Sequence, residues 1–431
     1  MIIAAHTLGC KLNYAETSDL LRRLSDEGNT IVDFHQKADL YLINTCTVTA
    51  VAEKKCRNAI RQAHRQNPDA QIVVMGCFAQ VAADEIERIP GVTLVLGNDR
   101  KHLLPQILKD LPPSLLPHSS FTSPSLPFTL QYSSGDRTRT FFKIQDGCDY
   151  FCTYCAIPYA RGRSRSATIE ETLCAARRIA DSGAKEVILT GVNTGTFGQH
   201  QGESFLDLLK GLDQIEGILR YRISSIEPNL LTDEIIDFVA HSRTFLPHFH
   251  IPLQAGSDHV LQLMRRRYDT ALYAAKLEKI KSVMPDACIA ADVMAGFNGE
   301  TKEEFQKVLT FIDSLPISYL HVFTYSDRPG TAALKLGEKI PIPVRHEHTA
   351  RLLELSEKKH KEFIASQLGK TRPVLWESTP HSNDQAIKQS SNQTMFGWTD
   401  NYIRICRPYD TTLVNTIEAV EISPKNIVRE D

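Results

Sequence analysis

The chain of 431 residues is long enough for about three domains, and it carries a formal net charge of −2 with 42% hydrophobic residues. This balance excludes binding of polyanions through a large overall positive charge, so a nucleic-acid partner would need local basic patches. The amino terminus lacks the basic start of a signal peptide, and no stretch approaches the ~20 uninterrupted apolar residues of a membrane helix. Ten cysteines favour metal or redox chemistry over disulfides. We therefore expect a cytoplasmic enzyme without membrane association.

Residues 1–112 alternate short apolar runs with helical patterns, which is typical of a parallel sheet covered by helices. Strands are expected at 2–5, 39–44, 71–75 and 92–96, and helices near 14–27, 51–66 and 80–88. A cysteine follows each of the first three strands, namely Cys10, Cys46 and Cys77. Because ligands gather at the carboxyl ends of parallel strands, these cysteines can converge on one metal centre. The alternative is that they are small buried hydrophobic residues, as we expect for Cys56.

The helix expected at 51–66 is basic. Its cationic residues are Lys54, Lys55, Arg57, Arg61 and Arg65. Such a cluster is compatible with binding to a phosphate backbone, and equally with a solvated helix face.

Residues 113–136 are rich in proline and serine and are expected to link the first domain to a central domain over 137–366. Six strand-like runs of the central domain are each followed by a helical pattern. They lie at 141–145, 186–190, 221–225, 248–254, 288–294 and 319–324. Six such units predict a partial (β/α)6 barrel of the TIM type, with functional groups at the carboxyl ends of its strands.

Three cysteines, Cys148, Cys152 and Cys155, follow the first strand of this barrel in a C-x3-C-x2-C spacing. One loop can wrap them around a single metal centre, and soft thiolates select zinc, Cu(I) or iron–sulfur clusters. A structural zinc site needs four ligands, and the next cysteine, Cys174, lies in a helical pattern. The spacing therefore favours an iron–sulfur cubane with one open iron; buried or zinc-binding cysteines are the alternative.

Polar turns, most of them containing glycine, follow four later strands of the expected barrel, at 191–195, 224–228, 254–257 and 296–300. Together with Glu227 and Asp292, their exposed backbone groups suit a zwitterionic, nucleoside-like cofactor better than a triphosphate. The sequence contains no phosphate-cradling P-loop.

Residues 367–431 contain short alternating runs at 371–377, 393–398, 402–406 and 417–422. Runs this short, separated by polar turns, predict a small antiparallel β-barrel. Basic and acidic residues nearly balance in this segment, so its composition alone does not predict nucleic-acid binding.

Motifs along nearly the whole chain resemble one enzyme family. They are Thr-Leu-Gly-Cys-Lys at 7–11, Asn-Thr-Cys-Thr-Val at 44–48, Gly-Cys-Phe-Ala-Gln at 76–80, the cysteine run with Ala-Arg-Gly at 160–162, Leu-Thr-Gly-Val-Asn at 189–193, Ile-Ser-Ser-Ile-Glu at 223–227, His-Ile-Pro-Leu-Gln-Ala-Gly-Ser at 250–257, Met-Arg-Arg-Arg-Tyr at 264–268 and Phe-Thr-Tyr-Ser-Asp-Arg-Pro-Gly-Thr at 323–331. The chain resembles the MiaB-type methylthiotransferases, a subfamily of radical S-adenosylmethionine (SAM) enzymes. This family has an amino-terminal three-cysteine domain, a partial barrel and a carboxyl-terminal RNA-binding barrel called TRAM. The chain departs from it at Ala255, where serine is usual, and at Asn298, where proline is usual.

The resemblance implies two [4Fe–4S] clusters. The first, on Cys148, Cys152 and Cys155, would take an electron from a donor such as flavodoxin or ferredoxin and break SAM into methionine and a 5′-deoxyadenosyl radical. The auxiliary cluster, on Cys10, Cys46 and Cys77, would keep an open iron for the sulfur, which a second SAM methylates. The SAM contacts carried over by similarity are Tyr154, Gly191, Ser225, Glu227, Gln254, Asp292 and Gly296. No general acid or base is assigned, because the C2–H of adenine is not acidic and requires a radical.

Details at 7–13, 44–55 and 397–402 resemble the MtaB branch most, which methylthiolates carbon 2 of N6-threonylcarbamoyladenosine beside the tRNA anticodon. This implies a tRNA anticodon stem-loop as partner, and we expect a monomer. The alternative substrates are isopentenyladenosine in tRNA and an aspartate of a ribosomal protein. The alternative from another class is a non-catalytic protein that binds zinc and RNA.

Two sets of residues have open roles: Arg161, Arg163 and Arg165, and Trp398, Tyr402 and Arg404. The first set lies beside the cysteine run and is compatible with phosphate, with the SAM carboxylate or with ion pairs inside the barrel. The second set is a candidate for stacking on an unpaired base, although Trp398 equally suits a core position.

Overall fold

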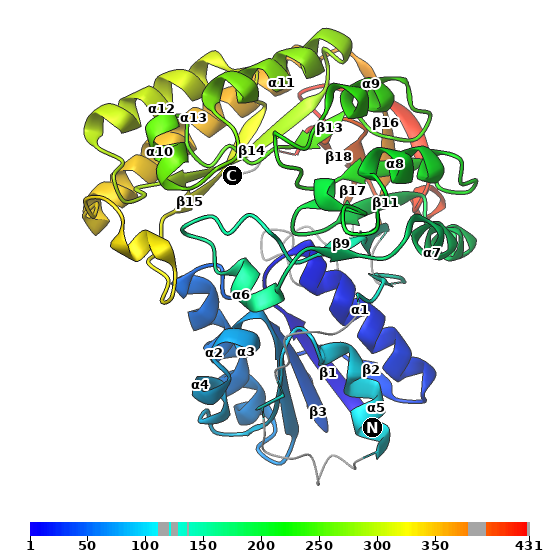
Figure 1. The fold of residues 1–431 in the computed structure, drawn as a ribbon. Helices are drawn as coiled ribbons and strands as arrows, with labels where there is room; N and C mark the ends of the chain where they lie inside the picture. The colour runs from blue at the N-terminus through cyan, green and yellow to red at the C-terminus, as the bar shows by residue number, and fades with distance from the viewer. Residues whose placement is uncertain (111–119, 122–127, 136–137, 378–393, 429–431) are drawn as a thin grey trace.

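The computed structural model describes residues 1–110, 120–121, 128–135, 138–377 and 394–428, so most of the expected linker at 113–136 lies outside the described residues. Figure 1 shows an amino-terminal α/β domain (blue to cyan) below a barrel of strands and helices (green to yellow), with a carboxyl-terminal sheet (orange to red) against the barrel. The helices of the described segments include none that is long and apolar enough to cross a membrane.

The amino-terminal sheet is parallel, as predicted, with the strand order β2-β1-β3-β4-β5-β6. Its strands are β1 (Ile2–Thr7), β2 (Thr30–Val32), β3 (Leu40–Thr45), β4 (Gln71–Gly76), β5 (Val92–Leu96) and β6 (Ser120–Phe121). Its helices are α1 (Lys11–Asp26), α2 (Ala50–Gln66), α3 (Cys77–Val81), α4 (Ala83–Glu87) and α5 (Leu104–Asp110), with a short η1 (Lys101–Leu103). The central strand β3 is buried along its whole length, because apolar cores form on both faces of the sheet.

The barrel contains six parallel strands in chain order, which confirms the predicted partial (β/α)6 architecture. They are β8 (Arg139–Lys143), β11 (Glu186–Thr190), β12 (Arg220–Ile223), β13 (His248–His250), β14 (Cys288–Ala295) and β15 (Tyr319–Thr324). β8, β11 and β12 form one paired group and β13, β14 and β15 another, and single parallel bridges, including Ser225 with His250, join the two groups. A short strand, β7 (Gln131–Tyr132), adds an antiparallel edge to β8 that the sequence pattern did not predict.

Helices cover the outside of the barrel, and most begin at a side-chain cap. The helices are α7 (Ile169–Asp181), α8 (Phe205–Asp213), α9 (Asp233–His241), α10 (Asp258–Leu263), α11 (Thr270–Val283), α12 (Lys302–Ser314) and the long α13 (Ile342–Gln367). The capping oxygens belong to Thr168, Ser204, Thr232, Ser257, Asp269 and Thr301, each of which accepts a hydrogen bond from a backbone N–H in the first turn. These caps end each connecting loop at a fixed residue and so fix the turns above the strands.

The carboxyl-terminal segment forms a curled antiparallel sheet with the order β18-β17-β16-β19, which resembles half a barrel. Its strands are β16 (Thr371–Trp376), β17 (Thr394–Thr399), β18 (Arg404–Pro408) and β19 (Ile417–Glu421), close to the predicted runs. The sheet docks on the amino-terminal ends of the barrel strands. Arg220 and Arg222 of β12 donate hydrogen bonds to backbone carbonyls of β16 and of residues 398–400, and Cys288 of β14 joins the apolar core of the sheet.

Candidate active site between two cysteine triads

The first triad, which we call the sheet triad, consists of Cys10, Cys46 and Cys77. These residues follow β1, β3 and β4, which are adjacent strands of the sheet. Cys10 directly precedes α1, and Cys77 is the first residue of α3. Gly76 makes the turn into α3 with φ +102°, and a Cβ atom there would lie 2.3 Å from the Asn44 side-chain oxygen. The turn therefore requires glycine, and it places Cys77 beside the other two cysteines.

Two cysteines of the sheet triad, Cys46 and Cys77, are buried, whereas Cys10 is exposed. Burial, followed by the nearby thiols of Cys77 and Cys10, raises the pKa of Cys46 to about 12. The side-chain amide of Asn98 lies 3.4 Å from the Cys77 sulfur and within donor distance of it. Three neighbouring cysteines without any disulfide fit a metal centre, whose positive charge would stabilise their thiolates.

Cys56 of α2 is buried, as expected, and it lies beside the sheet triad. Its sulfur accepts a hydrogen bond from the backbone N–H of Cys46 at 3.4 Å. Burial raises the pKa of Cys56 to about 11, and its inward position belongs to the apolar face that packs α2 on the sheet.

The second triad, which we call the loop triad, consists of Cys148, Cys152 and Cys155 after β8. Burial and the neighbouring cysteines raise the pKa of Cys148 to about 11 and that of Cys155 to about 12. The loop turns sharply at Gly147, with φ +70°, where a Cβ atom would lie 2.0 Å from the carbonyl oxygen of Arg163. The structure therefore brings both sets of predicted cysteines together, although the identity of the clusters that they hold stays a prediction.

Arg266 contacts the loop triad, and sequence reasoning did not assign it a role. Its guanidinium lies 3.2 Å from the Cys152 sulfur and 3.3 Å from the Tyr154 hydroxyl, and it pairs closely with Glu227. The Arg266 side chain is only 3% exposed. The arginine-rich stretch at 264–268 was visible in the sequence, but only the fold brings one of its three arginines to the cysteines.

The segment after Cys155 joins the two triads. It forms α6 (Ile157–Arg161), and the backbone carbonyl of Ala160 in this helix accepts a hydrogen bond from Asn98 at 2.8 Å, the same amide that approaches Cys77. Arg161 is buried in the network that joins the two domains, where it pairs with Glu16 of α1 and with Asp146. Ion pairing is thus the role that the structure gives to Arg161.

The two neighbouring arginines also make ion pairs. Arg165 donates to Asp146 at 3.1 Å, whereas Arg163 is exposed and pairs with Asp149.

A cavity of about 210 Å³ lies between the two domains. From the barrel it is lined by Tyr154, Cys155, Gln254 and Asp292, and from the amino-terminal domain by residues 48–49, which follow Cys46 closely. Arg328 closes one side, because it pairs with Glu53 of α2 and donates to Thr47 at 2.8 Å. The cavity therefore connects a loop-triad cysteine with the segment that carries a sheet-triad cysteine.

Six of the seven residues predicted to contact SAM divide into three groups. Tyr154, Gln254 and Asp292 line the cavity, and Glu227 approaches the loop triad through Arg266. Gly191 and Ser225 lie in neighbouring turns at the ends of β11 and β12.

Gly296 differs from these residues in its surroundings. A Cβ atom at this position would meet Arg345 of α13 at 2.4 Å. Close packing against α13 therefore accounts for Gly296 in this structure.

The aromatic residues proposed to stack on RNA bases contribute instead to domain docking. Tyr402 stacks between Trp398 and His248 of β13, with ring centroids 4.4 and 4.3 Å away. The guanidinium of Arg139 lies over the Trp398 ring, whose indole N–H donates to Glu377.

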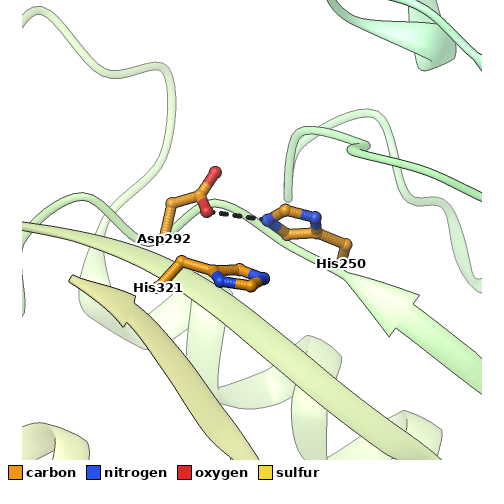
Figure 2. Close-up of side chains that lie close together, drawn as sticks. All are labelled: His250, Asp292 and His321. Atoms are coloured by element: carbon orange, nitrogen blue, oxygen red, sulfur yellow. Dashed lines mark hydrogen bonds and ion pairs between the residues drawn. The ribbon is translucent and has the colours of Figure 1, made fainter. Parts of the chain in front are cut away.

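Three polar side chains from consecutive barrel strands lie together, and one of them, Asp292, lines the cavity. They are His250 of β13, Asp292 of β14 and His321 of β15, and Figure 2 shows them directed toward one another. The His250 Nε2 and Asp292 Oδ1 atoms are 2.8 Å apart. His250 and His321 were not assigned a role from the sequence, because their separation along the chain hides that they share one side of the sheet.

Comparisons with known proteins agree with this arrangement. Residues 2–97 match the model of the uncharacterized protein family UPF0004, and residues 142–312 match that of the radical SAM superfamily. The threonylcarbamoyladenosine tRNA methylthiotransferase MtaB of Bacillus subtilis is 40% identical, over 97% of this chain and 93% of the relative. A tRNA-2-methylthio-N(6)-dimethylallyladenosine synthase of Syntrophus aciditrophicus is 33% identical, over 87% and 83%.

A solved structure shares the fold. The radical SAM methyltransferase TsrM of Kitasatospora setae, solved with tryptophan and a SAM analogue, aligns with a TM-score of 0.54 at 15% identity, over 74% of this chain and 72% of that protein. The family assignment rests on the sequence identities and their coverage, because a structure at 15% identity shows only that the fold is shared. The chain belongs to the radical SAM methylthiotransferase family and, within it, to the MtaB branch.

Proposed function

We propose that this protein methylthiolates carbon 2 of N6-threonylcarbamoyladenosine in tRNA, using SAM and two [4Fe–4S] clusters. The loop triad would hold the cluster that cleaves SAM, and the sheet triad would hold the auxiliary cluster. The observation that carries the proposal is the cavity that joins Cys155 to the segment after Cys46, because a substrate there would lie between both centres.

The chemistry of the substrate explains why such centres are needed. The C2–H bond of adenine is not acidic, so no His or Glu base could remove the proton at useful rates. When bound, the clusters and SAM would supply radical chemistry and a sulfur atom at this position.

The chain's own residues then bind, orient and exclude water. Arg266 would place its positive charge beside the loop triad and hold Glu227 there, and Tyr154 would form part of the cavity wall. The contact of Arg328 with Glu53 and Thr47 would close the cavity between the domains and so protect a reactive intermediate from solvent.

The names of several relatives support the choice of nucleoside. The Bacillus subtilis and Aquifex aeolicus relatives, at 40% and 38% identity, are named for threonylcarbamoyladenosine, whereas two relatives named for dimethylallyladenosine are 33% identical. We accordingly place the protein in the cytoplasm with a tRNA anticodon stem-loop as its partner and a flavodoxin or ferredoxin as its electron donor, and we expect a monomer.

A basic face near the cavity mouth suits the RNA backbone. Lys54, Lys55, Arg61 and Arg65 are exposed along α2, which starts next to Thr49 at the cavity wall. Exposed cations on one helix face can contact several phosphates. We further propose that the curled carboxyl-terminal sheet is a TRAM domain that adds RNA contacts.

Mass spectrometry of tRNA nucleosides tests the function. A deletion strain should lack 2-methylthio-N6-threonylcarbamoyladenosine alone, and the purified protein should restore it. Loss of the methylthio derivative of isopentenyladenosine instead would contradict the substrate assignment. Zinc without iron and sulfide in anaerobically purified protein would contradict the radical mechanism.

A further inference from the structure

Two buried asparagines connect the sheet triad with the helix that follows the loop triad. They are Asn13 of α1, which is 1% exposed, and Asn98 after β5, which is 7% exposed. Each side chain contacts the surroundings of a sheet-triad cysteine on one side and α6 on the other. We call Asn13 and Asn98 the bridging asparagines.

Asn13 connects two of the cysteine turns with α6. Its side-chain N–H groups donate to the carbonyl of Leu8, two residues before Cys10, at 2.9 Å and to the carbonyl of Thr45, directly before the second cysteine of the triad, at 3.1 Å. Its side-chain oxygen accepts a hydrogen bond from Arg161 of α6. One amide therefore holds the turns after β1 and β3 against the same helix.

Asn98 makes the corresponding connection for the third cysteine. Its side-chain nitrogen lies 3.4 Å from the Cys77 sulfur and donates to the Ala160 carbonyl of α6 at 2.8 Å. Its side-chain oxygen accepts a hydrogen bond from the Lys101 ammonium at 2.8 Å. Because an ammonium group can only donate and a carbonyl can only accept, these neighbours fix the orientation of the amide.

The helix α6 is attached to the loop triad at both of its ends. It begins at Ile157, two residues after Cys155. The carbonyl of Gly162, directly after the helix, accepts a hydrogen bond from the backbone N–H of Cys148 at 3.1 Å. Movement of α6 relative to the bridging asparagines would therefore change the separation of the two triads.

We infer that the bridging asparagines are positioning residues that fix the distance and the orientation between the two metal centres. The inference rests on the proposed function, in which one substrate must reach both centres from a single cavity. A misplacement of about 1 Å at the reacting groups can lower a rate about a hundredfold. Loosening of α6 should therefore impair sulfur insertion more than SAM cleavage, which requires the loop triad alone.

Only a group that donates and accepts at the same time can make these contacts. A carboxylate lacks the N–H groups, so Asn98→Asp retains the size of the side chain and its contact with Lys101 but loses the hydrogen bond to α6. Asn67 provides a matched control, because it is also 7% exposed and also donates to a backbone carbonyl, that of Ala38, at 2.8 Å. This carbonyl precedes β3, whereas the sheet triad lies beyond the carboxyl ends of the strands.

Hydrogen–deuterium exchange of the full-length, anaerobically purified protein tests the connection. Asn98→Asp and Asn13→Ala should accelerate exchange of the backbone amides at 157–162 about tenfold, the scale of one lost hydrogen bond. Asn67→Ala should accelerate exchange near Ala38 and leave residues 157–162 as in wild type. Iron content is measured for every variant, so that cluster loss is separated from loosening of α6.

Electron paramagnetic resonance tests the consequence for the two centres. The dipolar interaction between the two reduced clusters should be narrowly distributed in wild type and in Asn67→Ala, and broadened or shifted in Asn98→Asp and Asn13→Ala. The amount of 5′-deoxyadenosine formed per methylthiolated nucleoside should rise severalfold in these last two variants only. A purely stabilising role would lower the stability of all three variants without changing either quantity.

Unchanged exchange at 157–162 or an unchanged dipolar interaction in Asn98→Asp would overturn the inference, as would an equal response of Asn67→Ala. If Asn13→Ala does not fold, Asn98→Asp alone decides. Failure of the proposed function would look different. Wild type would then show no dipolar interaction between two clusters, or would modify no RNA, while the exchange of α6 would still respond to Asn98→Asp.

Discussion

The two cysteine triads reach similar environments by different routes. The loop triad lies within residues 148–155 and needs one turn, whereas the sheet triad draws on three strands and spans residues 10–77. In both triads, burial and neighbouring thiols raise the pKa of cysteines to about 12. Short spacing alone makes the loop triad recognisable in the sequence, whereas the sheet triad is recognisable only when a parallel sheet is expected.

The two triads also differ in their polar neighbours. The loop triad has a buried cation, Arg266, beside Cys152, and the sheet triad has a neutral amide, Asn98, beside Cys77. A cation beside a cluster raises its reduction potential more than an amide does, since hydrogen bonds and charge both tune iron–sulfur centres. We therefore expect the two centres to have different redox properties and different roles.

The largest expected effect separates those roles. Cys152→Ala should abolish SAM cleavage and methylthiolation together. Cys46→Ala should abolish methylthiolation only, because the cluster that cleaves SAM is held by the other triad. Chromatography of 5′-deoxyadenosine and of the modified nucleoside checks both variants. Loss of SAM cleavage in a Cys46→Ala protein that retains the loop-triad cluster would contradict the separate roles of the two triads.

The next largest effect concerns the buried ion-pair network between the amino-terminal domain and the barrel. Glu16 is 1% exposed and pairs with Lys101, Lys143 and Arg161. Glu16→Gln should lower the free energy of unfolding by about 3–5 kcal/mol, because it leaves buried cations uncompensated. Urea denaturation measures this change.

The matched control for this variant lies at the other end of the same helix. Glu27 follows α1 and makes an exposed ion pair with Lys109. Glu27→Gln should change the free energy of unfolding by less than about 1 kcal/mol. Equal effects of the two substitutions would contradict the structural role of the buried network.

Substitution of Arg266 tests whether this arginine sets the reduction potential of the loop-triad cluster. Arg266→Gln should slow SAM cleavage by about ten- to a hundredfold and lower the reduction potential of the loop-triad cluster, because outer groups tune bound metal centres on this scale. Asn98→Ala should leave that potential unchanged. Spectroscopic redox titration checks both variants, with exposed Arg265→Gln as the control, and an unmoved potential in Arg266→Gln would contradict the assignment.

Acid should weaken the contact between the domains. Burial alone raises the pKa of Glu16, but Arg161, Lys101 and Lys143 hold it well below its ordinary value. A depressed carboxyl pKa stabilises the fold fully above the unfolded value of about 4.3, and this contribution is lost as the pH falls toward the folded value. The stability difference between wild type and Glu16→Gln should therefore stay nearly constant from pH 7 to about pH 5 and shrink as the pH falls below about 4. A difference that does not shrink below pH 4 would contradict this role of Glu16.

The smallest expected effect lies on the surface. Lys54→Gln combined with Arg61→Gln should weaken RNA binding modestly and reduce the salt dependence of binding by about two phosphate contacts. SAM cleavage without RNA should not change. Binding titrations at several salt concentrations check this, and an unaltered salt slope would show that the exposed face of α2 does not contact the backbone.

Much of this molecule was predictable from its sequence. The six barrel strands, the four strands expected in the amino-terminal sheet and the four of the carboxyl-terminal sheet lie close to their predicted positions, because alternation of apolar runs and turns is a local property. The short edge strands β2 and β6 of the amino-terminal sheet were not predicted. The loop triad was predicted from the short spacing of its cysteines, and the sheet triad from the position of each cysteine directly after a predicted strand. The role of Cys56 as a buried residue followed from its helix position.

The contacts between distant segments were not predictable. Arg266 and Cys152 are 114 residues apart, so no local pattern pairs them. Trp398 and Tyr402 were candidates for base stacking, but the sheet that carries them docks on the barrel and uses their rings there. Gly296 fits a turn pattern, but its neighbour is Arg345 of α13, far along the chain.

The most direct test of the account is the iron and sulfide content of anaerobically purified protein, compared between wild type and the Cys148/Cys152/Cys155→Ala variant. Two four-iron clusters predict about eight irons in wild type and about four in the variant. Four irons falling to none would leave the sheet triad without a cluster. That result would contradict the central claim that two separately held centres face one cavity.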